Sequence, residues 1–183
     1  MRATALLKRQ HRRVEEIFDK LDDGDGAASV LLESLANDLA AHMAIEQDIF
    51  YPALRTFDPE LVEESYEEHA NAELALKRLL SVGAGDPTFD AKVAALKDLI
   101  LRHVELEEED LFPEIEETFD AAELDQLGEE MGIAFEKALE RGHQYLLPKG
   151  LAASGDRARG EVESSLDASP RRQSGRPPAR AIE

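Results

Sequence analysis

The sequence HMAIEQDIFYP at residues 42–52 recurs in outline as HVELEEEDLFP at residues 103–113. In each stretch a histidine is followed four residues later by a glutamate and ten residues later by a proline. Side chains four residues apart on a helix lie on the same face, with Cβ atoms about 5–6 Å apart. The repeat, with its constant offset of 61 residues, therefore predicts two helices that each direct a histidine and a glutamate toward one side.

Apolar residues continue this helical periodicity outward in both directions, at alternating spacings of three and four. Clusters of Gly, Asp and Pro divide the chain between the periodic segments, and Pro52 and Pro113 are expected to end two of them. Asp58 followed by Pro59 is typical of a helix start. The four long helices predicted in this way cover residues 4–22, 27–51, 59–81 and 88–111.

A fifth, shorter helix is predicted from a capping box at Asp120 to Glu123 as far as about Arg141. We therefore expect an all-α fold, an up-down-up-down four-helix bundle with an additional short C-terminal helix. The bundle should occupy residues 1–145, with its ligand-bearing part at 1–115. Residues 146–183 are rich in Gly, Pro and Arg and are expected to form a disordered tail.

The composition excludes several classes of protein and site. The chain has 183 residues and no cysteine, so a metal would have to be bound by imidazole and carboxylate groups. The formal net charge of −19 opposes binding to the phosphates of a nucleic acid. The sequence contains no apolar run of the roughly 18 residues that a membrane span needs and no signal-peptide core. A soluble, cytoplasmic protein without a membrane partner is expected.

Four of the five histidines lie on the inward apolar stripes of the four predicted long helices. A single histidine on such a stripe is usually a hydrogen-bonded core residue, but four on successive helices indicate a shared site. Burying ionised glutamates beside them is costly unless cations compensate the charge. We therefore predict a two-metal centre in which Glu46 and Glu107 bridge the ions. The predicted ligands are His11, His42, Glu46, His69, His103 and Glu107.

Two further residues on the third helix are candidates for an outer role. Glu73, one turn beyond His69, is interpreted as a partner that orients a ligand, with direct ligation or simple burial as alternatives. Tyr66, one turn before His69, is either a core tyrosine or a hydrogen-bond donor to the centre. The acidic run that includes Glu108 is expected to be solvated. His143 follows Gly142 and fits no stripe.

The H…HxxxE…H…HxxxE arrangement, with Pro52 and Pro113 after each HxxxE unit, resembles the hemerythrin-like HHE cation-binding domain family over about residues 1–115. The resemblance implies a non-haem centre of two Fe ions with a bridging oxo or hydroxo group. Zn or Mn would also suit these ligand types. Oxygen-carrying hemerythrins have a fifth ligating histidine where this sequence has Glu73, and an aspartate where it has Glu107. The departure argues against reversible oxygen carriage.

The resemblance therefore implies a di-iron protein that reacts with an oxidant, either hydrogen peroxide, O2 or nitric oxide, in the response to redox stress. Whether such a reaction is enzymatic turnover is left open by the sequence. The alternative is a metal- or oxygen-dependent sensor or binding module without turnover, whose protein partner the sequence does not identify. A bundle without metal is the third interpretation.

Overall fold

The computed structural model describes residues 1–24, 27–55 and 57–149, which form helices and no strand. Most of the predicted tail, from residue 150 onward, lies outside the described residues. No helix within the described ranges combines the length and the apolar character that crossing a membrane requires.

Helices occur where the apolar periodicity predicted them, but the expectation that the fifth is short is wrong, because that helix has 21 residues. Asp58 caps its helix by accepting a hydrogen bond from the Leu61 backbone N–H, and the capping box of Asp120 and Glu123 is present. The elements are α1 (Ala3–Asp22), α2 (Ala28–Ile45), η1 (Glu46–Phe50), α3 (Tyr51–Leu54), α4 (Pro59–Val82), α5 (Phe89–Glu105), η2 (Leu106–Leu111), α6 (Phe112–Thr118), α7 (Ala121–Arg141) and α8 (His143–Leu146).

The expectation that Pro52 and Pro113 end their helices is wrong. In both places a π-helical segment, η1 or η2, precedes the proline, and an α-helix continues through it as α3 or α6. The backbone N–H just before each proline donates to the carbonyl of Glu46 or Glu107, five residues back. Because the wider turn displaces the backbone carbonyls that the proline ring would meet, the ring is accommodated without breaking the helix.

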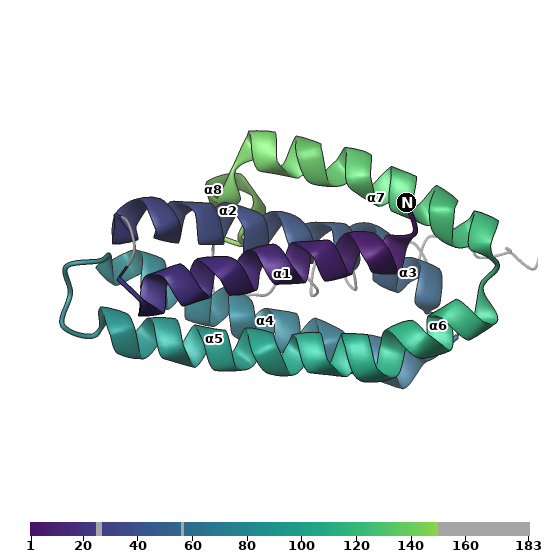
Figure 1. Ribbon diagram of the computed structural model, residues 1–183, viewed down its shortest axis with the longest axis horizontal. Coiled ribbons are helices and arrows are strands. Elements are labelled where there is room, and N and C mark those ends of the chain that lie inside the picture. Colours follow the sequence, from purple (N-terminus) through teal and green to yellow (C-terminus); the bar gives the residue numbers. More distant parts are fainter. Residues whose placement is uncertain (25–26, 56, 150–183) are drawn as a thin grey trace, which may run out of the picture.

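The four long helices lie side by side, as Figure 1 shows. Helix α1 packs against α2, α4 packs against α5, and further contacts join α1 to α5 and α2 to α4. Helix α7 lies across the outer side of α1 and α2, and the short α8 returns to α2 (Figure 1).

The core consists of two apolar clusters at opposite ends of these helices, separated by a band of buried polar side chains. One cluster lies toward the α1–α2 and α4–α5 turns and includes Phe18, Leu35 and Leu96. The other includes Leu7, Phe50 and Phe112. The polar band contains Gln10, His11, His42, Glu46, Gln47, His69, Glu73, His103 and Glu107. A buried polar layer of this kind requires specific partners, because its desolvation is unfavourable.

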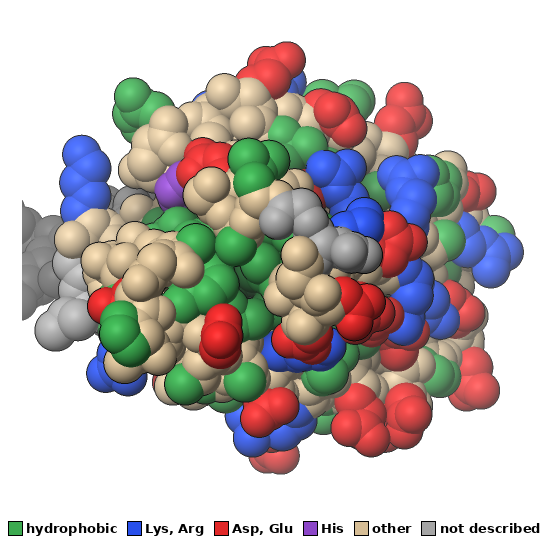
Figure 2. Space-filling model, turned by 60° about the vertical axis from the view of Figure 1, so that its left-hand side comes forward, with side chains coloured by type: hydrophobic (Ala, Val, Ile, Leu, Met, Phe, Trp, Pro, Cys, Tyr) green, Lys and Arg blue, Asp and Glu red, His purple; other side chains and the backbone are tan. Residues whose placement is uncertain are grey.

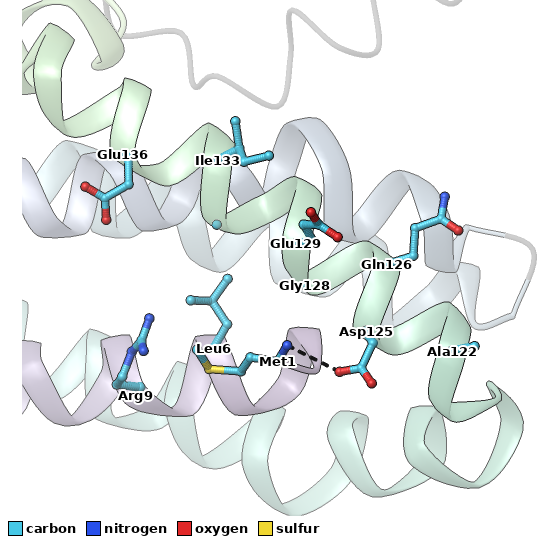
Figure 3. A pocket seen from close by; sticks show the side chains of 11 residues that line it. Met1, Leu6, Arg9, Ala122, Asp125, Gln126, Gly128, Glu129, Ile133 and Glu136 are labelled. Atoms are coloured by element: carbon cyan, nitrogen blue, oxygen red, sulfur yellow. Dashed lines mark ion pairs between the residues drawn. The ribbon is translucent and has the colours of Figure 1, made fainter.

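The start of α1 lies close against α7. A Cβ atom added to Gly128 of α7 would lie 2.1 Å from the Met1 carbonyl oxygen, so the absence of a side chain permits this approach. Beside the contact is an open groove of about 900 Å³, in which the Met1 amino group pairs with Asp125 (Figure 3). None of the six predicted ligands lines this groove.

Acidic and basic side chains are interspersed on the face of the molecule in Figure 2, with hydrophobic side chains gathered between them. Ion pairs such as Lys97 with Asp22 join opposite charges at the surface. Pairs of this kind contribute little to stability.

Candidate metal centre

The six predicted ligands converge from four long helices and the two π-helical segments. Each long helix contributes one histidine, and Glu46 and Glu107 lie in η1 and η2, one turn after the histidines of α2 and α5. None of the six residues is more than 4% exposed. The structure therefore brings the whole predicted set into the buried polar band.

The six residues form two overlapping groups of metal-ligating type. His11, His42, Glu46 and Glu107 offer atoms that all lie within 4.8 Å of one another, and Glu46, His69 and His103 do the same. Glu46 belongs to both groups, and its Oε2 atom lies 3.1 Å from Nε2 of both His42 and His69. The Glu46 carboxylate thus lies between two imidazoles that belong to different groups.

Glu107 lies beside the other two histidines, His11 and His103. Its Oε2 atom is 3.3 Å from His11 Nε2 and 3.7 Å from His103 Nε2. Among the described residues, Glu46 Oε1, Glu107 Oε2 and His11 Nε2 are buried without a hydrogen-bond partner. Buried polar atoms in this condition are unfavourable. A cation bound between them would satisfy all three, so the residues present fit a metal.

The electrostatics of the site also favour cations. Burial, followed by the charge of His11, lowers the pKa of His42 well below its ordinary value, and burial likewise lowers that of His69. These imidazoles are therefore neutral and available as ligands. Burial and the nearby Glu107 raise the pKa of Glu46 well above its ordinary value, whereas His103 and His11 lower that of Glu107 against the effect of burial. The negative charge of Glu107 opposes ionisation of Glu46, and a bound cation would relieve that opposition.

Two of the histidines are supported from outside by carboxylates. His11 Nδ1 lies 2.8 Å from Glu108 Oε1, and His103 Nδ1 lies 2.9 Å from Glu68 Oε2. The expectation that Glu108 is simply solvated is wrong, because its side chain is only 21% exposed and contacts a buried histidine. Glu68 was not singled out by the sequence at all. Its position directly before His69 is the signal that was available.

The other two histidines are supported by amides. His42 Nδ1 lies 2.9 Å from Gln10 Oε1, and His69 Nδ1 lies 3.1 Å from Gln47 Nε2. With each Nδ1 atom occupied by an outer partner, all four rings direct Nε2 toward the centre. Such outer hydrogen bonds fix ring orientation in metal sites.

Tyr51 is a residue of the centre that sequence reasoning missed. Its hydroxyl lies 3.1 Å from His69 Nε2 and donates a hydrogen bond of 3.0 Å to Glu107 Oε1. Burial, followed by Glu107 and Glu46, raises the pKa of Tyr51 well above its ordinary value, so the hydroxyl keeps its proton. In the internal repeat Tyr51 aligns with Phe112, and the hydroxyl that distinguishes the two residues was the signal that could have identified Tyr51.

Glu73 and Tyr66 both contact Gln47, the outer partner of His69. The buried carboxylate of Glu73 accepts a hydrogen bond of 3.4 Å from Gln47 Nε2, and the Tyr66 hydroxyl donates to the Gln47 backbone carbonyl at 3.0 Å. Neither residue belongs to the two ligand-type groups. Their position is therefore that of outer neighbours of His69.

A small cavity adjoins the four histidines. Its other lining side chains are apolar: Val14, Leu39, Met43, Ile100 and Val104. The imidazoles therefore border an apolar surface on this side of the centre.

Comparison with protein families gives one match that covers most of the helical part. The model of the hemerythrin HHE cation-binding domain matches residues 2–115. This range contains the six predicted ligands and their four outer partners.

Individual relatives share about a quarter of the aligned residues with this chain. A protein named DNA nickase from Nostoc sp. (strain PCC 7120) is 25% identical over 139 residues, which make up 74% of this chain and 40% of that protein. This chain thus spans less than half of the nickase. An uncharacterized protein of Mycobacterium tuberculosis is 26% identical over 156 residues, or 83% of this chain and 96% of that protein.

A solved structure shows the same fold. The crystal structure of a hemerythrin HHE cation-binding domain-containing protein from Mycobacterium kansasii superimposes with a TM-score of 0.67. It is 26% identical in sequence, and the alignment covers 77% of this chain and 89% of the other.

Proposed function

This chain belongs to the hemerythrin HHE cation-binding domain family, and from that premise we propose that its buried centre binds two iron ions and reacts with small oxidants. The observation that carries the proposal is the position of Glu46 in two overlapping groups of buried ligand-type residues. The contacts of α1 with α2 and α5, and of α4 with α2 and α5, support an up-down-up-down four-helix bundle around that centre.

The proposed ligands divide into two sets. His11 and His42 hold one ion and His69 and His103 hold the other, with Glu46 and Glu107 bridging them. Imidazole and carboxylate also suit zinc and manganese. Iron is preferred because the resemblance to hemerythrin implies it.

Bound iron would supply the electron exchange with hydrogen peroxide, O2 or nitric oxide. The protein contributes the surroundings of that chemistry. A small cavity with otherwise apolar lining lies beside the four histidines. The protonated Tyr51 hydroxyl, within hydrogen-bond distance of both Glu107 and His69, provides a donor on one side of the centre. Reaction in the cytoplasm during redox stress, without nucleic acid or membrane, is the setting that we propose.

Glu73 stands where oxygen-carrying hemerythrins have a fifth ligating histidine, and this difference favours reaction with an oxidant over reversible storage of O2. Glu73 contacts Gln47 and lies outside both ligand-type groups. The set of protein ligands is therefore smaller than that of oxygen-carrying hemerythrins, which leaves positions on the ions for an exchangeable small molecule.

The test is metal analysis and an optical spectrum of protein purified without chelators, followed by addition of hydrogen peroxide, O2 and nitric oxide. We expect two irons per chain and consumption of at least one oxidant. His42→Ala and Glu107→Ala should lose iron, whereas His143→Ala, outside the centre, should retain it. An iron-loaded sample that reacts with none of the three would contradict the proposal.

A metal-dependent sensor or binding module without turnover is the second candidate. The match to 40% of the Nostoc DNA nickase favours this candidate, because the similar segment of the nickase is one part of a longer protein. Metal binding coupled to helix stability provides the physical basis. Limited proteolysis should then cut metal-free and iron-loaded protein differently, with no oxidant consumed.

A further inference from the structure

The outer partners of the four histidines follow the internal repeat of the chain. Gln10 directly precedes His11, and Glu68 directly precedes His69. Each turns toward the histidine of the next long helix: Gln10 Oε1 lies 2.9 Å from His42 Nδ1. Glu68 Oε2 lies 2.9 Å from His103 Nδ1. The two contacts are equivalent, but one partner is an amide and the other is a carboxylate.

The second pair of partners follows the bridging glutamates. Gln47 comes after Glu46 and Glu108 comes after Glu107. Gln47 lies 3.1 Å from His69 Nδ1 through Nε2, and Glu108 lies 2.8 Å from His11 Nδ1. Again the equivalent positions hold one amide and one carboxylate.

The distribution gives each proposed ion one partner of each kind. In the His11–His42 set, His11 is supported by a carboxylate and His42 by an amide. In the His69–His103 set, His103 is supported by the carboxylate and His69 by the amide. The repeat alone does not require this balance, because exchanging one amide with its equivalent carboxylate would give one ion both carboxylates.

The two carboxylates, Glu68 and Glu108, are less buried than the two amides. Each of them is held in place by an arginine. Arg12 forms an ion pair with Glu108, and Arg102 lies 3.5 Å from Glu68. The two arginines therefore help to hold the carboxylates beside the histidine rings. A carboxylate that accepts the Nδ1 proton makes the imidazole a stronger donor to a metal at Nε2 than a neutral amide does. For His69 to bind through Nε2, the Gln47 amide must turn by half a rotation to present its oxygen to Nδ1.

We propose that Glu68 and Glu108 are positioning residues which, with Gln10 and Gln47, equalise the affinity of the two metal positions. Each ion receives one strongly donating and one weakly donating imidazole. The inference rests on the proposed function, since it requires two ions bound by the four histidines.

Exchange variants test this balance without changing net charge. Gln10→Glu combined with Glu68→Gln moves the carboxylate from His103 to His42, so the His11–His42 position gains affinity and the His69–His103 position loses it. Gln47→Glu combined with Glu108→Gln moves the other carboxylate from His11 to His69 and has the opposite effect. Changes of outer partner alter metal affinity by about 10–100-fold. We expect the ratio of the two dissociation constants to change by about tenfold or more in each variant.

The measurement is titration of metal-free protein with zinc(II), which has no redox chemistry, while the ¹⁵N signals of the histidine rings report which Nε2 atoms are bound. In wild-type protein the first equivalent should distribute over both positions. It should fill the His11–His42 position in the first exchange variant and the His69–His103 position in the second. The variant that carries both exchanges, with four substitutions in all, again has one carboxylate for each ion and should behave like wild type.

The outcomes separate the two proposals. Failure of wild-type protein to bind two ions would overturn the proposed function and the inference with it. Two bound ions in wild type, with the same filling order and ratio in both exchange variants, would overturn the inference alone. Melting temperatures of the metal-free variants show whether each one folds. If one exchange fails to fold, the opposite exchange gives the decisive result.

Discussion

A single residue, Glu46, shows most directly how function and stability oppose each other in this chain. Its carboxylate is fully buried and lies between His42 and His69. Burial first, and Glu107 second, raise the pKa of Glu46 above its ordinary value. In the folded, metal-free protein the group therefore binds its proton more tightly than it does in the unfolded chain. The residue therefore lowers the stability of the metal-free state.

Replacing Glu46 by glutamine should stabilise the metal-free protein while weakening metal binding. Because the folded pKa of Glu46 is raised, its contribution to stability is present below the unfolded pKa, about 4.3, and is lost as pH rises. The advantage of Glu46→Gln should therefore grow from about pH 4.3 toward neutrality. There the free energy of unfolding should exceed that of wild type by about 1.4 kcal/mol for each pH unit that separates the folded from the unfolded pKa of Glu46. Urea denaturation across this pH range measures it.

The exposed Glu109 provides the matched control for that experiment. Glu109→Gln removes the same formal charge without altering the buried centre, so its stability should follow wild type at each pH. A Glu46→Gln variant that binds two ions as tightly as wild type would contradict the bridging role.

Tyr51→Phe tests the donor beside the centre. The variant introduces the residue that already occupies the equivalent position of the repeat, Phe112, so packing should be preserved. Two metal ions should still bind, but reaction with hydrogen peroxide should slow by about a hundredfold, the typical effect of removing one donor in a site that excludes water. Tyr66→Phe is the control, since the Tyr66 hydroxyl donates to the Gln47 backbone carbonyl. Equal stopped-flow rates for the two variants would remove Tyr51 from the mechanism.

At the scale of elements, the long helices were predictable and the π-helical segments were not. The stripe through Leu35, Leu39 and His42 repeats with the helical period, so the pattern indicates both the helix and its buried face. A π-helical turn such as η1 adds a residue without removing an apolar one, and the sequence pattern hardly changes. Pro52 was therefore interpreted as a helix end, although the wider turn accommodates it within a continuing helix.

The contact between α7 and the start of α1 leads to a prediction at the same scale. Gly128→Ala would place a Cβ atom 2.1 Å from the Met1 carbonyl oxygen and 2.7 Å from the Ala3 backbone nitrogen. The two helices must separate, at a cost of about 1–3 kcal/mol in the free energy of unfolding. Gly132→Ala, one turn later, meets no atom within 4 Å and should instead add about 0.5–1 kcal/mol through its helix propensity. Chemical denaturation of both variants compares them, and equal stabilities would contradict the close approach.

For the molecule as a whole, the sequence predicted which residues converge but not how they are supported. His11 and His103 were identified because their positions on apolar stripes depend only on the spacing within one helix. Glu68 and Glu108 were missed because each contacts a histidine of another helix, and such a contact depends on the rotation of neighbouring helices about their axes. Beside an apolar stripe, a glutamate that faces a neighbouring helix and one that faces water have the same sequence signature.

The last prediction concerns how much of the chain the centre needs. All proposed ligands lie within residues 1–149. The Gly-, Pro- and Arg-rich composition of residues 146–183 is not typical of a packed core, so a chain ending at Lys149 should bind two ions and melt close to the wild-type temperature. A chain ending at Gly142 should be less stable. It loses Leu147, which is only 9% exposed and packs in the same cluster as Phe18 and Leu35, at a cost of about 1.5–3 kcal/mol. It also loses the hydrogen bond from the His143 backbone N–H to Asn37 Oδ1. Calorimetry with and without bound zinc distinguishes the two truncations. A drop in melting temperature for the chain ending at Lys149 would show that residues beyond it stabilise the helical domain.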